Sequence, residues 1–383
     1  MNKKKISVIG LGYIGLPFLI ILAKNKFNVV GIENNKEKLS LIKRGKYKTE
    51  ENDINKEITI LRKKKIPFFN KVINSDIYIL CLPTPIKKNK TCDTSAIDKV
   101  LREIAPKLKN EDTIIIESTV PIGFTDKFYN KLKKLRSDLN KIHISYVSEK
   151  AIPGRTIYEM INNDRVIGCE RTSENKINYV YKKFVKGNIY FTSTKIAEAS
   201  KIVENTHRDL NIGIANYLDN KLRKKKIDTK KVFALSNKHP RVNILSPSIG
   251  VGGHCLPVDP YFIDNNKKGL ISQVRKINDD RTNYFYKKLK DILKKYKNKK
   301  ICFWGLGYKV DSLDLRNSPS FKIFNKLKNK NYYVSDFKGK LNVKKFIFYK
   351  EALNSCKIHV IFQMNKKVKK YFRNKTIINV IDL

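Results

Sequence analysis

The feature that most limits the possible folds of this chain is a glycine turn near its start. Residues 5–9 are predicted to form a buried strand, and Gly10, Gly12 and Gly15 follow it ahead of an apolar helix that extends to about residue 24. These glycines permit a tight turn and a close approach of a pyrophosphate to the helix N-terminus. The pattern predicts a doubly wound α/β unit that binds a dinucleotide, the alternative being a glycine turn that binds nothing.

Acidic and hydroxyl side chains follow the next predicted strands. Glu33 ends the strand at 28–33, where a carboxylate can accept hydrogen bonds from a ribose 2′-OH and would repel a 2′-phosphate, so NAD is expected rather than NADP. Lys38, one helical turn further on, could flank the adenosine. Thr84 and Thr119 follow the strands at 77–82 and 113–117, where ligands bind in such sheets, although each could be only a turn residue.

The Gly-Leu-Gly-Tyr sequence at 10–13 recurs at 305–308, again after an apolar strand, and predicts an internal repeat. The second copy has no third glycine but is followed by Lys309 and Arg316, whose cations suit a diphosphate. We therefore expect two Rossmann-like parallel-sheet domains joined by a central helical domain. The predicted boundaries are 1–190 for the NAD-binding domain, 191–295 for the helical domain and 296–383 for a nucleotide-sugar-binding domain.

One cysteine stands in a loop that suits covalent chemistry. Cys255 follows Gly252 and Gly253, whose N–H groups can approach a bound group closely, and Asp259 comes four residues later. A thiolate in such a loop could attack a carbon centre. The alternative is a buried, unreactive cysteine in a glycine turn.

A predicted helix at 197–222 carries Lys201, Asn205 and Arg208 at positions i, i+4 and i+7, so the three side chains project from one face. This row of donors could stabilise an oxyanion, or it could be a solvated face. Glu149, after the strand at 144–147, is a candidate general base.

Composition excludes several classes of protein. The 383 residues are too many for one ordinary core, and six cysteines without C-x-x-C pairing indicate a reducing cytoplasm and predict no metal site. The net charge of +46 comes from lysines spread along the whole chain, so we expect attraction of anionic substrates rather than nucleic-acid binding. No run of ~18 uninterrupted apolar residues predicts membrane insertion.

Taken together, these motifs resemble the UDP-glucose/GDP-mannose dehydrogenase family over nearly the whole chain. The matching stretches are residues 8–17, 117–119, 163–168, 204–212, 239–245, 250–262 and 315–319. The resemblance implies an NAD-dependent, four-electron oxidation of a UDP-sugar C6 alcohol to a carboxylate. It also implies that Cys255 captures the aldehyde as a thiohemiacetal, which is oxidised to a thioester and hydrolysed.

The resemblance further assigns roles by position. Lys201 and Asn205 would stabilise the oxyanion, Asp259 would hold a water for proton removal, and Glu149 would assist hydrolysis. Cofactor positions are matched by Tyr13, Ile14, Glu33, Thr84, Thr119 and Arg316. Substrate positions are matched by Lys150, Ala151, Lys201, Asn205, Arg208, His239, Arg241, Gly252, Tyr308 and Lys309. Arg241 tends to reach the substrate of a neighbouring subunit in such families, which implies a homodimer.

The expected substrate is UDP-N-acetyl-D-mannosamine, for cell-surface polysaccharide synthesis. The alternatives are UDP-N-acetyl-D-glucosamine, which differs in configuration at C2, and a nucleotide-sugar-binding protein without turnover. The chain departs from the family pattern at Ser148 and Lys150, at Ser248-Ile249, and at Asn317 in place of a usual glutamate. It also lacks the arginine that the family often carries near its C-terminus, but no departure removes a residue assigned to the chemistry.

Overall fold

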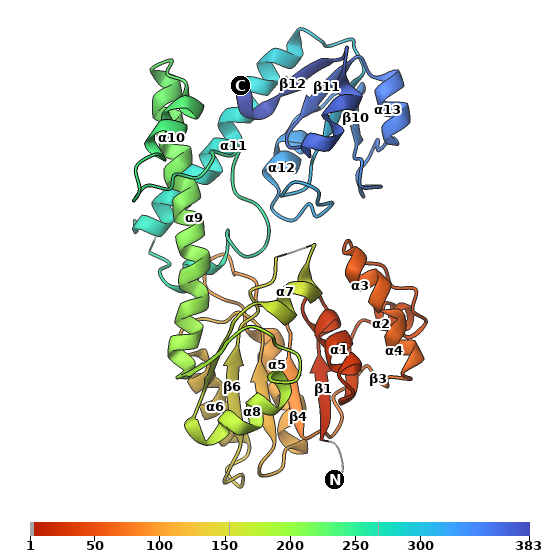
Figure 1. Ribbon diagram of the computed structural model, residues 1–383, viewed down its shortest axis with the longest axis vertical. Coiled ribbons are helices and arrows are strands. Elements are labelled where there is room, and N and C mark those ends of the chain that lie inside the picture. The colour runs from red at the N-terminus through yellow and green to blue at the C-terminus, as the bar shows by residue number, and fades with distance from the viewer. Residues whose placement is uncertain (1–3, 153, 267) are drawn as a thin grey trace. The chain divides into compact units, whose positions relative to one another are not determined.

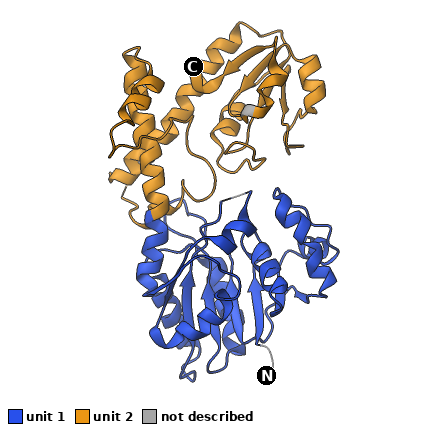
Figure 2. Ribbon diagram, in the orientation of Figure 1, with its two compact units in different colours: residues 1–203 blue, residues 204–383 orange. Residues whose placement is uncertain are grey.

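The computed structural model describes residues 4–152, 154–266 and 268–383. The chain forms two compact units, Met1–Val203 and Glu204–Leu383 (Figure 2). The long helix α9 (Thr194–Lys224) begins in the first unit and continues in the second. The three-part division into residues 1–190, 191–295 and 296–383 stays a prediction.

Unit 1 contains an eight-stranded sheet in the order β3-β2-β1-β4-β5-β6-β7-β8 (Figure 1). The strands are β1 (Lys5–Ile9), β2 (Asn28–Ile32), β3 (Phe68–Phe69), β4 (Ile77–Leu80), β5 (Thr113–Ile116), β6 (His143–Val147), β7 (Arg165–Cys169) and β8 (Ile189–Thr192). All neighbouring strands are parallel except β6 and β7, which are antiparallel. The sheet is therefore mixed at this point, where the sequence predicted only parallel strands.

Alternate residues of the central strands enter two separate cores, which explains why these strands are apolar without interruption. Ile77 and Ile79 pack into one core, and Tyr78 and Leu80 into the other. The helices of this unit are α1 (Gly15–Lys24), α2 (Lys36–Lys43), α3 (Asn52–Glu57), α4 (Thr59–Lys63), α5 (Ser95–Ile104), α6 (Phe124–Leu135), α7 (Thr156–Asn162) and α8 (Glu174–Tyr181). Residues of α1, α4, α7 and α8 belong to the first core and those of α5 and α6 to the second, so helices cover both faces.

Unit 2 contains a four-stranded parallel sheet in the order β10-β9-β11-β12. Its strands are β9 (Ile301–Trp304), β10 (Tyr332–Ser335), β11 (Ile358–Ile361) and β12 (Thr376–Asn379). Its other helices are α10 (Thr229–Ser236), α11 (Leu270–Lys294), α12 (Pro319–Lys326) and α13 (Tyr349–Ser355). Alternation again separates two cores, with Phe303 facing residues of α11 and α12, and Trp304 facing α13. The two predicted Rossmann-like sheets are thus confirmed.

Within the part of the chain that the structure describes, no helix combines the length and apolar character that crossing a membrane requires.

Candidate active site

The first glycine turn lies between β1 and α1, as predicted. Gly10 donates its N–H to the carbonyl of Ile32 at 2.9 Å, and α1 begins at Gly15. At Gly12 an added Cβ would meet no atom within 4 Å, so this position leaves room for a ligand beside the helix N-terminus. The turn therefore fits the pyrophosphate of a dinucleotide.

Glu33 follows β2 and is buried, with its carboxylate accepting the N–H of Asn35 at 3.1 Å. Lys38 forms an ion pair with Glu33 at 2.9 Å, so the two predicted adenosine contacts lie together. The hydroxyl of Tyr13 accepts a hydrogen bond from Thr156 Oγ1 at 2.9 Å, which ties the turn to α7. Ile14 directly precedes α1 and packs against the first core.

The two predicted threonines also lie together. Thr84 Oγ1 donates to the carbonyl of Thr119 at 2.7 Å, which joins the segments that follow β4 and β5. Ser118, to which the sequence analysis gave no role, fixes the same pair of segments. Its Oγ accepts the N–H of Leu82 at 2.8 Å and donates to the carbonyl of Leu82 at 2.8 Å.

Glu149 organises the segment after β6. One carboxylate oxygen accepts the N–H groups of Lys150 and Ala151, both at 2.7 Å. The carbonyl of Glu149 accepts a hydrogen bond from Lys201 Nζ at 2.6 Å, and the Lys201 side chain is buried. Four predicted site residues are thus brought together in unit 1.

Behind Glu149 lies a buried cluster that the sequence analysis missed. Arg165, at the start of β7, forms an ion pair with Glu149, in which Nη2 lies 2.5 Å from Oε2. Tyr181 donates its hydroxyl to Glu117 Oε1 at 2.5 Å. Burial raises the pKa of Glu117 to about 8, and the neighbouring Glu149 charge adds to this rise. Arg165 and Glu117 both stand in stretches that matched the family, but an isolated motif does not show which residue faces which.

In unit 2, Asn205 and Asp259 meet. Asn205 Nδ2 donates to Asp259 Oδ2 at 2.6 Å, and both side chains are buried. The carbonyl of Cys255 accepts the N–H groups of Val258 at 2.9 Å and Asp259 at 2.8 Å, so the cysteine and the carboxylate share one turn. Cys255 is partly exposed. A partly exposed thiol is accessible to a substrate carbon, unlike the buried Cys302 and Cys356.

The cysteine loop packs against the loop that follows β9. Gly253 donates its N–H to the carbonyl of Arg316 at 3.0 Å, and Asn317 Nδ2 donates to the carbonyl of Gly253 at 3.0 Å. An added Cβ at Gly252 would lie 2.8 Å from the Cβ of Tyr308, closer than real Cβ contacts come. Arg316 is itself paired with Asp314 at 2.5 Å. These contacts bring Gly252 and Tyr308 together as predicted substrate positions, and Lys309 Nζ lies 6.0 Å from the Tyr308 ring centroid.

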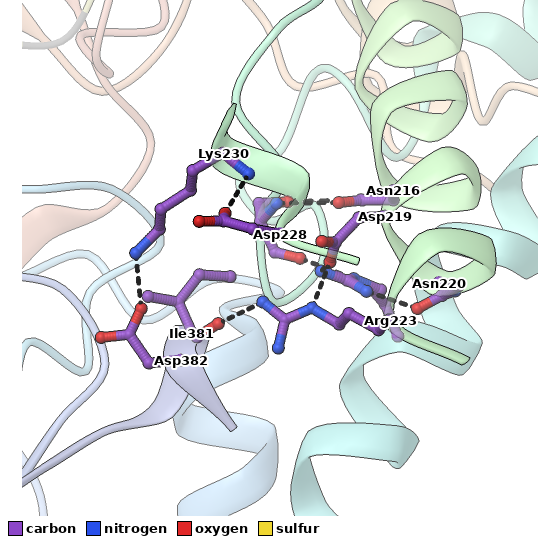
Figure 3. A network of polar contacts seen from close by, with 10 residues as sticks. Asn216, Asp219, Asn220, Arg223, Asp228, Lys230, Ile381 and Asp382 are labelled. Atoms are coloured by element: carbon purple, nitrogen blue, oxygen red, sulfur yellow. Dashed lines mark hydrogen bonds and ion pairs between the residues drawn. The ribbon is translucent and has the colours of Figure 1, made fainter. Parts of the chain in front are cut away.

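A network of buried polar side chains anchors the start of the cysteine loop. Ser248 donates its N–H to Asn216 Oδ1 at 2.8 Å, and its carbonyl accepts Arg281 Nε at 2.9 Å. Arg281 also pairs with Asp219, which pairs with Arg223 at 2.8 Å. Figure 3 shows this network continuing to the last residues, where Arg223 Nη2 donates to the carbonyl of Ile381 at 2.7 Å. Ser248, one of the departures from the family pattern, is therefore held by hydrogen bonds to Asn216 and Arg281.

Three predicted substrate residues are exposed, namely Arg208, His239 and Arg241. Arg241 donates its N–H to His239 Nδ1 at 3.3 Å within one turn. Arg208 thus departs from the buried row that Lys201 and Asn205 form on α9. The roles of all three residues stay predictions. Among the described residues, no group of three or more His, Cys, Asp or Glu side chains is placed to hold a metal ion.

A Rossmann unit with a glycine turn after β1 and a buried carboxylate after β2 has the features of an NAD-dependent oxidoreductase. The NAD-binding domain of the UDP-glucose/GDP-mannose dehydrogenase family matches residues 4–185, and the central domain of the same family matches residues 195–280. The chain belongs to this family, and its substrate is therefore a nucleotide sugar.

Individual relatives agree over most of the chain. A UDP-N-acetyl-D-mannosamine dehydrogenase of Methanocaldococcus jannaschii is 37% identical, with 96% of this chain and 87% of the relative covered. An NDP-N-acetyl-D-galactosaminuronic acid dehydrogenase of Ralstonia nicotianae is 33% identical over 84% of this chain and 80% of the relative. Among solved structures, UDP-D-ManNAc dehydrogenase of Pyrococcus horikoshii has a TM-score of 0.84 and 31% identity, covering 98% of this chain and 94% of that one.

Proposed function

We propose that this protein oxidises C6 of UDP-N-acetyl-D-mannosamine from an alcohol to a carboxylate, with reduction of two NAD⁺ and consumption of one water. The observation that carries the proposal is the turn that holds Cys255 and Asp259, with Asp259 bonded to the buried Asn205. Such an arrangement offers a nucleophile, a carboxylate and an amide donor at one place. The names of the relatives support the choice of sugar.

The proposed chemistry needs a bound cofactor and a nucleophile. Gly12 and Glu33 would hold NAD, which when bound supplies the hydride acceptor for each oxidation. The Cys255 thiolate adds to the aldehyde carbon, and the resulting thiohemiacetal keeps that carbon from escaping between the oxidations. Loss of a second hydride and a proton leaves a thioester. Water then cleaves the carbon–sulfur bond, which releases the carboxylate and restores the thiol.

The remaining roles follow from hydrogen-bonding capacity. Lys201 and Asn205 carry donors that stabilise negative charge on the substrate oxygen, and Asp259 accepts a proton through a bound water. Glu149 assists the hydrolysis. Lys309 provides a cation for the diphosphate of the sugar nucleotide, and Arg316 provides a cation for the cofactor. Arg241 would reach the substrate of a second copy in a homodimer, and the product would supply a cell-surface polysaccharide from the cytoplasm.

The test is NADH formation by purified protein supplied with NAD⁺ and one nucleotide sugar at a time. UDP-N-acetyl-D-mannosamine should give two NADH per sugar and the highest kcat/KM. Faster turnover of UDP-N-acetyl-D-glucosamine or UDP-N-acetyl-D-galactosamine would overturn the substrate assignment. NAD binding without NADH from any of these sugars would favour the non-catalytic alternative.

A second experiment tests the role of the thiol. Cys255→Ser should abolish formation of the uronate while leaving the NAD dissociation constant within about twofold, because a hydroxyl is a far poorer nucleophile than a thiolate. The control is Cys81→Ser, which replaces a cysteine of unit 1. This variant should still form the uronate at a measurable rate. Uronate formation by the Cys255 variant would exclude covalent catalysis at this residue.

A further inference from the structure

The buried cluster behind Glu149 contains two carboxylates and one guanidinium. Glu117 follows β5, Glu149 follows β6, and Arg165 begins β7, so three adjacent strands of the sheet bring the groups together. All three side chains are buried, as is Tyr181 at the end of α8. The buried ammonium of Lys201 acts on Glu117 as Arg165 does and lowers its pKa, and the thiol of Cys81 faces both carboxylates. Burial outweighs both cations at Glu117, so a second ionised carboxylate carries a high desolvation cost here.

The hydrogen bonds indicate which carboxylate is charged. Glu149 accepts two backbone N–H groups and faces Arg165 Nη2, which are the surroundings that an ionised carboxylate requires. Glu117 accepts the Tyr181 hydroxyl, and its other oxygen finds no hydrogen-bond partner among the described residues. A carboxylic acid with one such acceptor bond is far less costly to bury than a carboxylate.

The charge on Glu149 matters because this residue sets the position of others. Its carboxylate fixes the backbone at Lys150 and Ala151, and its carbonyl fixes the ammonium of Lys201. The ion pair between Arg165 and Glu149 therefore helps to fix the positions of Lys150 and Ala151, and also that of the Lys201 ammonium. A second negative charge at Glu117 would draw the guanidinium away from Glu149 and repel its carboxylate.

We propose that Arg165 and Glu117 are positioning residues for the oxidation: Glu117 retains a proton, so that the single charge of Arg165 is committed to Glu149. This inference rests on the proposed function and deepens it. Both side chains are buried, and neither is proposed to contact the substrate. Both act through Glu149 on Lys150, Ala151 and Lys201.

The proposal predicts an alkaline limb in the pH profile of kcat. Activity should fall as the pH rises through about 8, where Glu117 loses its proton. In Glu117→Gln the amide oxygen still accepts the Tyr181 hydroxyl and the group cannot ionise, so the limb should vanish. In Tyr181→Phe the donor that favours ionised Glu117 is lost, so the limb should move to higher pH.

Glu198→Gln provides the matched control. Glu198 is another buried glutamate of unit 1 with a raised pKa, caused by burial, but it accepts hydrogen bonds from Gly123 and Thr125 rather than facing Arg165. This variant should lose stability yet keep the alkaline limb. An unchanged limb in Glu117→Gln, or its disappearance in both glutamine variants, would overturn the proposal.

The positioning role of Arg165 is tested by comparing the effects of its substitution on kcat and on the KM for NAD⁺. Arg165→Met should lower kcat by about tenfold to a hundredfold through misplaced groups, with the KM for NAD⁺ within about twofold. Arg165→Lys keeps the charge and should recover part of the loss. Folded Arg165→Met with the parental kcat and pH profile would contradict the assignment.

An activity-independent readout separates this inference from the proposed function. Because the folded-state pKa of Glu117 is raised, the folded chain binds more protons than the unfolded chain between about pH 4.3 and 8. The urea midpoint of the parent relative to Glu117→Gln should therefore fall as the pH rises across this window and level off above it. No NADH from any nucleotide sugar would refute the function, whereas a flat difference in midpoint would refute the buried proton.

Discussion

The two glycine turns of this chain start alike and end differently. Gly10 follows β1 with φ of +88°, and Gly305 follows β9 with φ of +71°, a region that favours glycine. In each unit an added Cβ would collide with a carbonyl just beyond the neighbouring strand. This is the carbonyl of Cys81, directly after β4, in unit 1 and that of Gln363, two residues after β11, in unit 2. The strand-to-turn geometry is thus repeated within the chain.

The difference begins two residues later. Gly12 faces open space, whereas a Cβ on Gly307 would overlap the carbonyl of Ser312. After the first turn α1 starts at once, but after the second a loop intervenes and α12 starts only at Pro319. That loop bonds to the cysteine loop through Arg316 and Asn317. The same turn therefore leaves room for a dinucleotide in unit 1 and supports the cysteine loop in unit 2.

The largest effect is expected for Gly15→Ala. Its Cβ would overlap the carbonyl of Gly10, so the free energy of unfolding should fall by about 3 kcal/mol. NAD affinity should fall about a hundredfold, because the helix N-terminus is displaced from the pyrophosphate. Urea unfolding and NAD titration measure the two quantities. Gly12→Ala, at the open position, is the control: it should leave the free energy of unfolding nearly unchanged while lowering the affinity for NAD. If both variants were equally destabilised, the two glycines would not differ in their surroundings as the structure shows.

Gly307→Ala should give the complementary result. The new Cβ would overlap the carbonyl of Ser312, so the free energy of unfolding should fall by about 2 kcal/mol. The rate of NADH formation should also fall, because the loop that holds Gly253 is displaced. NAD affinity should stay within about twofold of the parent, since the first turn is intact. Loss of NAD binding in this variant would show that the two turns do not have separate roles.

Glu33→Gln tests the carboxylate that follows β2, and its effect should be smaller because it changes charge but not packing. The amide keeps the shape of the side chain but loses the charge-assisted bonds to the ribose, so NAD affinity should fall about tenfold. The preference for NAD over NADP should narrow, because the charge that repels a 2′-phosphate is gone. Titration with both dinucleotides measures this, and an unchanged preference would show that Glu33 does not select the cofactor.

The smallest effect is expected for Asn317→Gly. Asn317 has φ of +49°, which glycine tolerates, so the change removes only the hydrogen bond to Gly253. The free energy of unfolding should fall by about 1 kcal/mol, with a modest loss of kcat. Asn317→Ala adds backbone strain at the same position and should cost more. Equal stability of the two variants, measured by urea unfolding, would argue against the left-handed conformation.

The placement of several predicted site residues could be foreseen because it depends on short stretches of sequence. The spacing of Lys201 and Asn205 on one helix puts both side chains on one face, and both are buried in the structure. Arg208 continues the same spacing but is exposed. Helical periodicity determines which side chains share one face of the helix. It does not determine how much of that face is buried by the rest of the protein.

The sequence by itself determined the strand, turn and helix at Gly10–Gly15, the carboxylate at Glu33 and the cysteine loop, because each needs only neighbouring residues. Only the tertiary structure decided that Arg165 faces Glu149, that Glu117 lies behind them, and that Gly307 is covered by Ser312. Buried charges are stable only beside specific partners, and these partners come from three different strands, β5, β6 and β7, that pair in the sheet. Strand order and loop packing, rather than local pattern, therefore fixed the surroundings of the reactive groups.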